Sequence, residues 1–394
     1  MIAKPLKVMI VMSLAEQKGG GELMLVHLME HGRNAGIEWQ VVFLQDGPMV
    51  QQIRDFGVEV QVIEAGRLRQ PHKILGTIWK LRRLAKANQI DLIFSWMHKP
   101  HLYGGPAAML CGKPAMWYQL GTPRRSSLLD WLAHLIPAKA IISCGPEGLE
   151  QQTKFWPRRP GRLVLPGVEL DRFDPSKLPS AAEARRLLNL PTTGPIIGIV
   201  GRMQTWKGMH VLVQAMPAIL AKHADAHCLI IGGKHDPEPN YPEFLAETIR
   251  SHGVEKRVIL AGLQKNIPVW VAAMDVFVHA SDHEPFGLVV LEGMAMGKPV
   301  VAGSEGGPRF IITHGENGLL APYGNAPELA RAVLTYLDDP ASAAKIAQAG
   351  QQRAREFSTD RYAQNLCQAI KELTGIAAST QAEPLAQLSG QNVR

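Results

Sequence analysis

Two carboxylates, Glu284 and Glu292, stand eight residues apart, with a Pro, a Gly and a run of apolar residues between them. The Pro-Phe-Gly segment predicts a loop, and the apolar run at residues 288–296 predicts the helix that this loop opens. Glu292 is the only charge in that helix, and a buried carboxylate is costly unless it finds partners. Helix-start amides with two carboxylates would hold a ligand that is anionic and rich in hydroxyl groups, such as a sugar nucleotide. A structural ion pair or a solvated helix end is the alternative that these residues leave open.

Two cations, Arg202 and Lys207, follow a strand predicted at residues 195–200 and stand five residues apart. An Arg can grip phosphate oxygens with two parallel hydrogen bonds, and a Lys adds a point charge. Two such cations would replace a divalent metal opposite a diphosphate leaving group, although an ordinary solvated pair is the alternative. The four cysteines are scattered, and Asp282 with His283 makes no metal site alone. We therefore expect no metal, and no cofactor beyond a nucleotide-sugar co-substrate.

The elements that must position these residues follow a repeating strand–helix order. The first predicted strands are residues 7–12, 39–44, 58–63, 91–96, 115–119 and 140–144, with helices between them. A second series has strands at 195–200, 226–231, 258–261, 276–280 and 299–302. This alternation implies parallel strands joined by right-handed crossovers. The predicted fold class is therefore α/β, with two Rossmann-like doubly wound domains that face a central cleft.

The length of 394 residues exceeds what one hydrophobic core supports, which also indicates two domains. We assign residues 1–175 to the first domain and residues 176–357 to the second. A last helix at 358–374 carries an apolar stripe that suits packing back onto the first domain. The tail at 375–394 is rich in Ala, Gln and Ser without periodicity, and we expect it to be disordered.

The turn Gly19–Gly20–Gly21 follows the first predicted strand and precedes a helix predicted from Leu23. Strand, glycine turn and helix bring a backbone close to a phosphate, although a simple tight turn is the alternative. The turn is not a GxGxxG fingerprint, so dinucleotide binding is poorly supported. Ligands of such folds bind at the carboxyl ends of the strands. The loops expected to face one cleft are 201–207, 232–234, 261–263, 280–287 and 303–307.

The net charge of +7 is unevenly placed, because residues 1–175 contain 22 Lys and Arg against 15 Asp and Glu. The basic stretches are Arg67, Arg69, Lys73, Lys80, Arg82, Arg83 and Lys86, then Arg124 and Arg125, then Arg158, Arg159 and Arg162. They suit an anionic membrane surface or an anionic acceptor, although an ordinary solvated surface remains open. Nucleic acid is not expected, because no binding motif is present. The scattered cysteines indicate a reducing compartment, and no apolar run reaches the roughly 20 residues of a membrane span.

Several motifs occur in an order that resembles glycosyltransferase family 4. They are Gly201–Arg202 with Lys207–Gly208, the run Glu284–Leu288 with Glu292, residues 293–302, and residues 316–320. The resemblance covers roughly residues 7–372 and is more specific in the second half. It implies the GT-B fold, with an acceptor-binding first domain and a sugar-nucleotide-binding second domain. It also implies retaining chemistry.

The resemblance assigns a role to each matching residue. Arg202 and Lys207 would hold the donor diphosphate and stabilise the charge that develops as it departs. Glu292 would bind the ribose, and Glu284 would bind the transferred sugar and share the catalytic role with the two cations. The other donor-binding residues implied are Gly20, Gly21, Gly262, Leu263, Phe286, Gly287 and Leu288. On the acceptor side, His98 and His101 would stand near the sugar or acceptor, with a purely packing role as the alternative.

The implied function is transfer of a sugar from a UDP- or GDP-linked donor to a glycan or lipid-linked acceptor in lipopolysaccharide or other cell-surface polysaccharide biosynthesis. The expected location is cytoplasmic, with peripheral attachment to the inner face of the membrane. The alternatives are a sugar-nucleotide epimerase or phosphorylase of the same fold, and a non-catalytic membrane-associated partner. The chain departs from the family pattern in residues 117–121, which lack a His, and in Pro166–Glu169, which lacks an Asn. Both departures concern the acceptor side.

Overall fold

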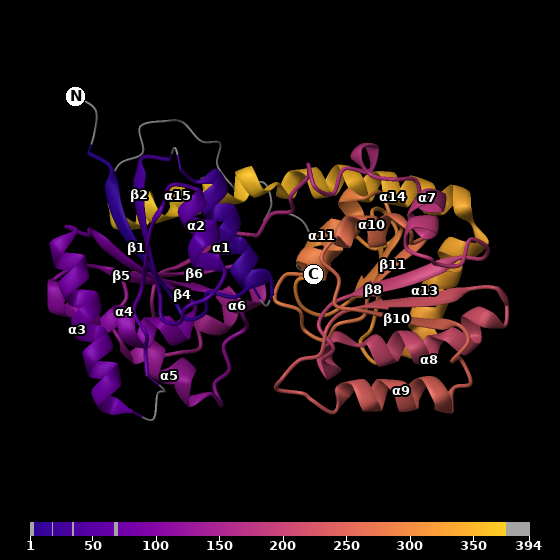
Figure 1. Ribbon diagram of the computed structural model, residues 1–394, viewed down its shortest axis with the longest axis horizontal. Coiled ribbons are helices and arrows are strands. Elements are labelled where there is room, and N and C mark those ends of the chain that lie inside the picture. Colours follow the sequence, from indigo (N-terminus) through magenta and orange to yellow (C-terminus); the bar gives the residue numbers. More distant parts are fainter. Residues whose placement is uncertain (1–3, 18, 34, 67–69, 376–394) are drawn as a thin grey trace.

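The computed structural model describes residues 4–17, 19–33, 35–66 and 70–375 (Figure 1). Lys18, Arg67, Arg69 and residues 376–394 of the expected disordered tail lie outside these residues. Figure 1 shows two α/β units side by side, with the yellow C-terminal helices running from the second unit back to the first. Both units have parallel sheets, which confirms the predicted fold class.

The first unit is built on seven parallel strands in the order β3-β2-β1-β4-β5-β6-β7. They are β1 (Leu6–Met12), β2 (Ile37–Phe43), β3 (Glu59–Val62), β4 (Leu92–Trp96), β5 (Ala115–Gln119), β6 (Ala140–Ser143) and β7 (Gly161–Leu163). The strands β4, β5 and β6 are buried along their whole length, as apolar runs covered on both faces should be. The sequence does not predict β7, because its three residues follow a proline-rich stretch and carry no alternation.

Helices cover both faces of this sheet. On one face, α1 (Gly20–His31), α2 (Met49–Asp55) and α15 (Thr359–Thr374) share a core with the strands. The other face is covered by α3 (Pro71–Ala87), α4 (His98–Cys111) and α5 (Leu128–Leu135). The short helix α6 (Pro146–Gln152) follows β6 and is absent from the sequence-based expectations. The start of α1 at Gly20, rather than at Leu23, makes the glycines part of its first turn.

The second unit has six parallel strands in the order β10-β9-β8-β11-β12-β13. They are β8 (Ile196–Val200), β9 (His227–Ile231), β10 (Val258–Gly262), β11 (Val276–His279), β12 (Val300–Gly303) and β13 (Leu319–Ala321). The helices are α7 (Ala181–Leu187), α8 (Met209–Leu220), α9 (Tyr241–Ser251), α10 (Ile267–Ala272), α11 (Leu288–Ala295), α12 (Pro308–Ile311), α13 (Ala326–Asp338) and α14 (Pro340–Ala354). Because all strands are parallel, the loops after β8, β11 and β12 lie at one edge of the sheet.

Two segments connect the units and pair with each other. Val168 N donates to Phe357 O at 2.7 Å, and Thr359 N donates to Val168 O at 3.3 Å. A Cβ on Gly167 would stand 2.3 Å from Ser358 O, so this close approach requires glycine. The second segment leads into α15, whose buried stripe packs on the first unit. Within the part of the chain described, no helix is long and apolar enough to cross a membrane.

Candidate functional site

Lys207 and Glu284, from two loops at the carboxyl edge of the second sheet, form an ion pair. Lys207 ends the short 3-10 turn Thr205–Lys207 after β8, and Glu284 lies in the loop after β11. His279, the last residue of β11, places Nε2 3.3 Å from the same carboxylate oxygen. Burial alone would raise the pKa of Glu284, but these two neighbours lower it to about 2. The carboxylate is therefore ionised at neutral pH and tied to a cation.

The loop that carries Glu284 is held by the loop after β12. Gly307 N donates to Glu284 O at 2.6 Å. A Cβ on Gly306 would stand 2.4 Å from the same oxygen, and a Cβ on Gly307 would stand 2.2 Å from Phe286 Cα. Glycine is therefore needed at both positions, because any side chain would push the two loops apart. Gly287, with φ of 99°, is the N-cap that precedes α11.

The glycine turn of the first domain meets the second domain at this edge. A Cβ on Gly19 would lie 3.8 Å from Arg202 Cζ, and a Cβ on Gly20 would lie 3.1 Å from Leu288 Cδ1. Leu288, the first residue of α11, packs against the cores of both domains. Arg202, on the loop that also bears Lys207, thus approaches the start of α1. Among the implied donor-binding residues, the structure thus pairs Lys207 with Glu284 and brings Gly20 close to Leu288.

Glu292 lies half-buried in α11, as its position in an apolar helix predicts. Burial raises the pKa of Glu292 to about 7, against the opposing effect of Arg172. Glu169 adds to the rise, because a second negative charge stands in the same region. A carboxylate with so high a pKa is poorly compensated by the protein itself, which leaves it able to accept hydrogen bonds from a ligand.

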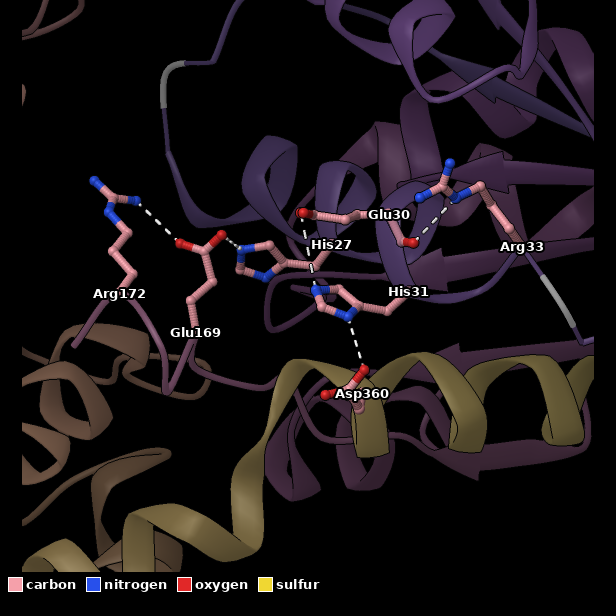
Figure 2. Close-up of polar contacts among 7 residues, drawn as sticks. All are labelled: His27, Glu30, His31, Arg33, Glu169, Arg172 and Asp360. Atoms are coloured by element: carbon pink, nitrogen blue, oxygen red, sulfur yellow. Dashed lines mark hydrogen bonds and ion pairs between the residues drawn. The ribbon is translucent and has the colours of Figure 1, made fainter. Parts of the chain in front are cut away.

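A polar cluster joins α1 to the segments that connect the two domains (Figure 2). Glu169 lies 3.4 Å from Nε2 of the buried His27 on α1, and 3.1 Å from Nη1 of Arg172. The contact with His27 lowers the pKa of Glu169 to about 2, although burial opposes it. One turn further along α1, His31 Nδ1 lies 2.7 Å from Asp360 at the start of α15 (Figure 2). The cluster therefore joins α1 to both connecting segments.

The two acceptor-side histidines occupy different environments. His98 is half-buried in the first turn of α4, with Nδ1 3.7 Å from the buried Asp130, and burial lowers its pKa. His101 is fully buried, with its ring 4.5 Å from that of Trp117, and burial lowers its pKa to about 3. His101 is therefore a neutral core residue, which favours the packing role over a place near the sugar or acceptor. Its place one turn into α4 points it at the sheet rather than at the other domain.

The remaining predicted residues frame the edge of the second sheet. Gly262 ends β10 with φ of 69°, and Leu263 after it is 80% exposed. Phe286 is buried against Phe357, with ring centroids 6.0 Å apart, so its backbone rather than its side chain is the part that a ligand could reach. Sequence reasoning missed His279, because it closes an apolar strand. Its polarity at that strand end is the signal that could have found it.

Comparisons with known proteins agree with this geometry. Residues 18–172 match the family described as Glycosyltransferase Family 4, and residues 180–353 match the family described as Glycosyl transferases group 1. The lipopolysaccharide core biosynthesis glycosyltransferase LpsE of Rhizobium meliloti is 27% identical over 363 residues, which is 88% of this chain and 96% of LpsE. The D-inositol 3-phosphate glycosyltransferase of Corynebacterium urealyticum is 32% identical over 216 residues. That match covers 54% of this chain and about half, 51%, of the relative.

A crystal structure of Anabaena HepE in complex with UDP has a TM-score of 0.79 and 23% identity, and the match covers 93% of this chain and 100% of HepE. Two parallel-sheet α/β domains with a polar site where they meet define the GT-B class of glycosyltransferases. Within that class, the two family matches in tandem decide the assignment. The chain belongs to glycosyltransferase family 4.

Proposed function

We propose that this chain is a retaining glycosyltransferase that moves a sugar from a UDP- or GDP-linked donor to a glycan or lipid-linked acceptor without a metal. The setting we propose is lipopolysaccharide or other cell-surface polysaccharide biosynthesis. The relative LpsE, named for lipopolysaccharide core biosynthesis, supports this setting. The enzyme would act in the cytoplasm, attached peripherally to an anionic membrane surface. The charge excess of residues 1–175 supports that attachment.

The ion pair of Lys207 with Glu284, with Arg202 on the loop that bears Lys207, is the observation that carries the proposal. A diphosphate carries two negative charges and would compete with Glu284 for Lys207. Arg202, next to the glycine turn, would add a second cation and donate two hydrogen bonds in parallel. Both cations would then stabilise the charge that develops on the departing diphosphate. Released from Lys207, Glu284 could accept hydrogen bonds from hydroxyl groups of the transferred sugar.

The other residues would place the rest of the donor. Glu292 would accept hydrogen bonds from the ribose hydroxyls, which supply the polar partners that its surroundings lack. The amides at Gly287 and Leu288, at the start of α11, would meet the groups between ribose and sugar. Gly20 and Gly21 would let the first domain approach the diphosphate. Retention would follow from front-face attack, in which the acceptor hydroxyl enters on the leaving-group side and a donor phosphate oxygen takes its proton.

Two variants test the proposal. Lys207→Ala and Glu292→Gln should each lower sugar transfer by roughly a hundredfold or more, because each removes a contact made to the donor. When a panel of UDP- and GDP-sugars is screened, one donor should raise the melting temperature of the wild-type chain. The same donor should leave the melting temperatures of the two variants unchanged. Lys256→Ala and Glu255→Gln, exposed on the turn after α9, are matched controls.

The products decide between the proposal and its alternatives. The anomeric configuration of the product, measured by NMR, should equal that of the donor. Inversion would contradict the retaining chemistry. Full activity of either site variant would contradict the site. An epimerised sugar nucleotide, or a product that requires inorganic phosphate, would replace the proposal with one of the other enzymes.

A further inference from the structure

The helix α5 turns an unpartnered row of leucines to the outside. Leu128, Leu132 and Leu135 stand at positions i, i+4 and i+7 and are 72%, 41% and 54% exposed. The opposite side of the helix, with Asp130, Ala133 and His134, is buried against the first domain. A surface helix normally shows the reverse pattern, with polar residues outward. The solvent-facing side of α5 is therefore apolar, where a surface helix would normally carry polar or charged residues.

Exposed apolar side chains concentrate on this layer of the first domain. Within the described ranges, 14 large hydrophobic residues are exposed, and nine of them lie on α3, α4, α5 or the turn after α6. These nine are Leu75, Trp79, Met109, Leu110, Leu128, Leu129, Leu132, Leu135 and Trp156. None of the 14 belongs to α1, α2 or α15, which cover the other face of the same sheet. The exposed apolar residues are therefore clustered on one face of the first domain. Scattered single residues would be spread over both faces.

The same layer is strongly basic. The described stretch at residues 70–129 contains nine Lys and Arg but a single acid, Asp91. Arg124 and Arg125 are exposed directly before α5. On α3, Arg82 stacks over Trp79 at 4.7 Å from the ring centroid and donates to Leu110 O at 3.2 Å, so a cation joins the apolar residues of two helices. Apolar anchors and cations therefore share one face.

We propose that the outer face of α3, α4 and α5 docks on an anionic lipid bilayer, with the α5 leucines entering the acyl boundary and the cations meeting lipid phosphates. Leucines and Trp between Lys and Arg are the composition of surfaces that lie in a membrane interface. A second copy of this chain fits less well, because a two-fold contact would place the cations of this face against themselves. Charge complementarity thus selects an anionic surface.

The docking face adjoins the proposed acceptor side. The loop between β5 and α5 begins at Leu120, whose side chain lies 3.0 Å from where a Cβ on Gly21 would stand. The membrane contact on α5 would therefore directly follow the loop that begins at Leu120 and approaches the glycine turn. The inference rests on the proposed function only where the docked face would bring a lipid-linked acceptor to the site. Membrane binding itself needs neither donor nor transfer.

Sedimentation of the full chain with vesicles tests the proposal. The wild-type chain should sediment with phosphatidylcholine vesicles that contain phosphatidylglycerol, and not with phosphatidylcholine alone. The double change Leu128→Ser with Leu132→Ser should weaken this binding about tenfold or more, because two leucine side chains that would enter the bilayer are lost. Leu187→Ser with Phe244→Ser, at exposed positions of the second domain, is the matched control and should bind like the wild type. The double change Lys80→Glu with Arg83→Glu should remove the difference in binding between vesicles with and without phosphatidylglycerol.

Each outcome has one meaning. Unchanged vesicle binding by both the leucine and the charge variants would overturn the proposal. A change of molecular mass in solution, seen by light scattering in the leucine variant alone, would assign the face to a second copy and also overturn it. Far-UV circular dichroism and the melting temperature show that the variants fold. A chain that binds vesicles normally but transfers no sugar would sink the proposed function and leave the docking face standing.

Discussion

His279 Nε2 lies 3.3 Å from Oε2 of Glu284, the oxygen that Lys207 also contacts. The His279 ring is buried at the end of β11, so the protein holds it in place. If a donor diphosphate draws Lys207 away, His279 remains to orient Glu284 and to favour its ionised form. His279 is then a positioning residue that acts on the sugar through Glu284.

Changing His279 should alter the pH dependence of transfer. We expect His279→Leu to raise the pKa of Glu284, so that activity is lost at a higher pH on the acid side than in the wild type. A hydrogen bond to a charged group contributes about 1.5–3 kcal/mol, so kcat/KM should fall roughly tenfold to hundredfold. His279→Gln keeps a donor and should restore most of the loss. The measurement is kcat/KM against pH; a uniform loss without a shifted acid limb would point to packing alone.

The carboxylate of Glu292, which we propose binds the ribose, should lower the free energy of unfolding of the chain. Its folded pKa is raised from 4.5 to about 7, so the cost is absent below pH 4.5 and complete above pH 7. Glu292→Gln should therefore raise the free energy of unfolding by about 1–3 kcal/mol at pH 8 and change little at pH 4. Urea unfolding at the two pH values checks this, with Glu255→Gln as the exposed control. A Glu292→Gln variant that is less stable at pH 8 would show that the carboxylate is paired within the protein.

Most of the fold could be predicted from sequence because its parallel strands are continuous apolar runs. The strand at residues 115–119 was predicted with the bounds that the structure gives it. The elements that escaped are short: β7, α12 and α6 have three, four and seven residues. The start of α1 was placed late, because glycine is a weak helix former and its close approach to Leu288 is visible only in three dimensions.

The candidate site was partly predictable for a related reason. Strand ends locate loops, so Arg202, Lys207 and Glu284 could be placed at one edge of the second sheet. Sequence could not show that Lys207 pairs with Glu284, because that depends on how two loops pack. It also could not separate His98 from His101, whose burial differs by their positions on one helical turn.

Glu169 should make stability pH-dependent in the direction opposite to Glu292. Its pKa is lowered from 4.5 to about 2, so its contribution is complete above pH 4.5 and is lost as the pH falls toward 2. Glu169→Gln should lower the free energy of unfolding by about 1–2 kcal/mol at pH 7, and the difference from the wild type should vanish near pH 2. The urea midpoint measured from pH 2 to pH 7 checks this, again with Glu255→Gln as the control. A difference that stays constant across this range would mean that the carboxylate of Glu169 is not what joins His27 and Arg172.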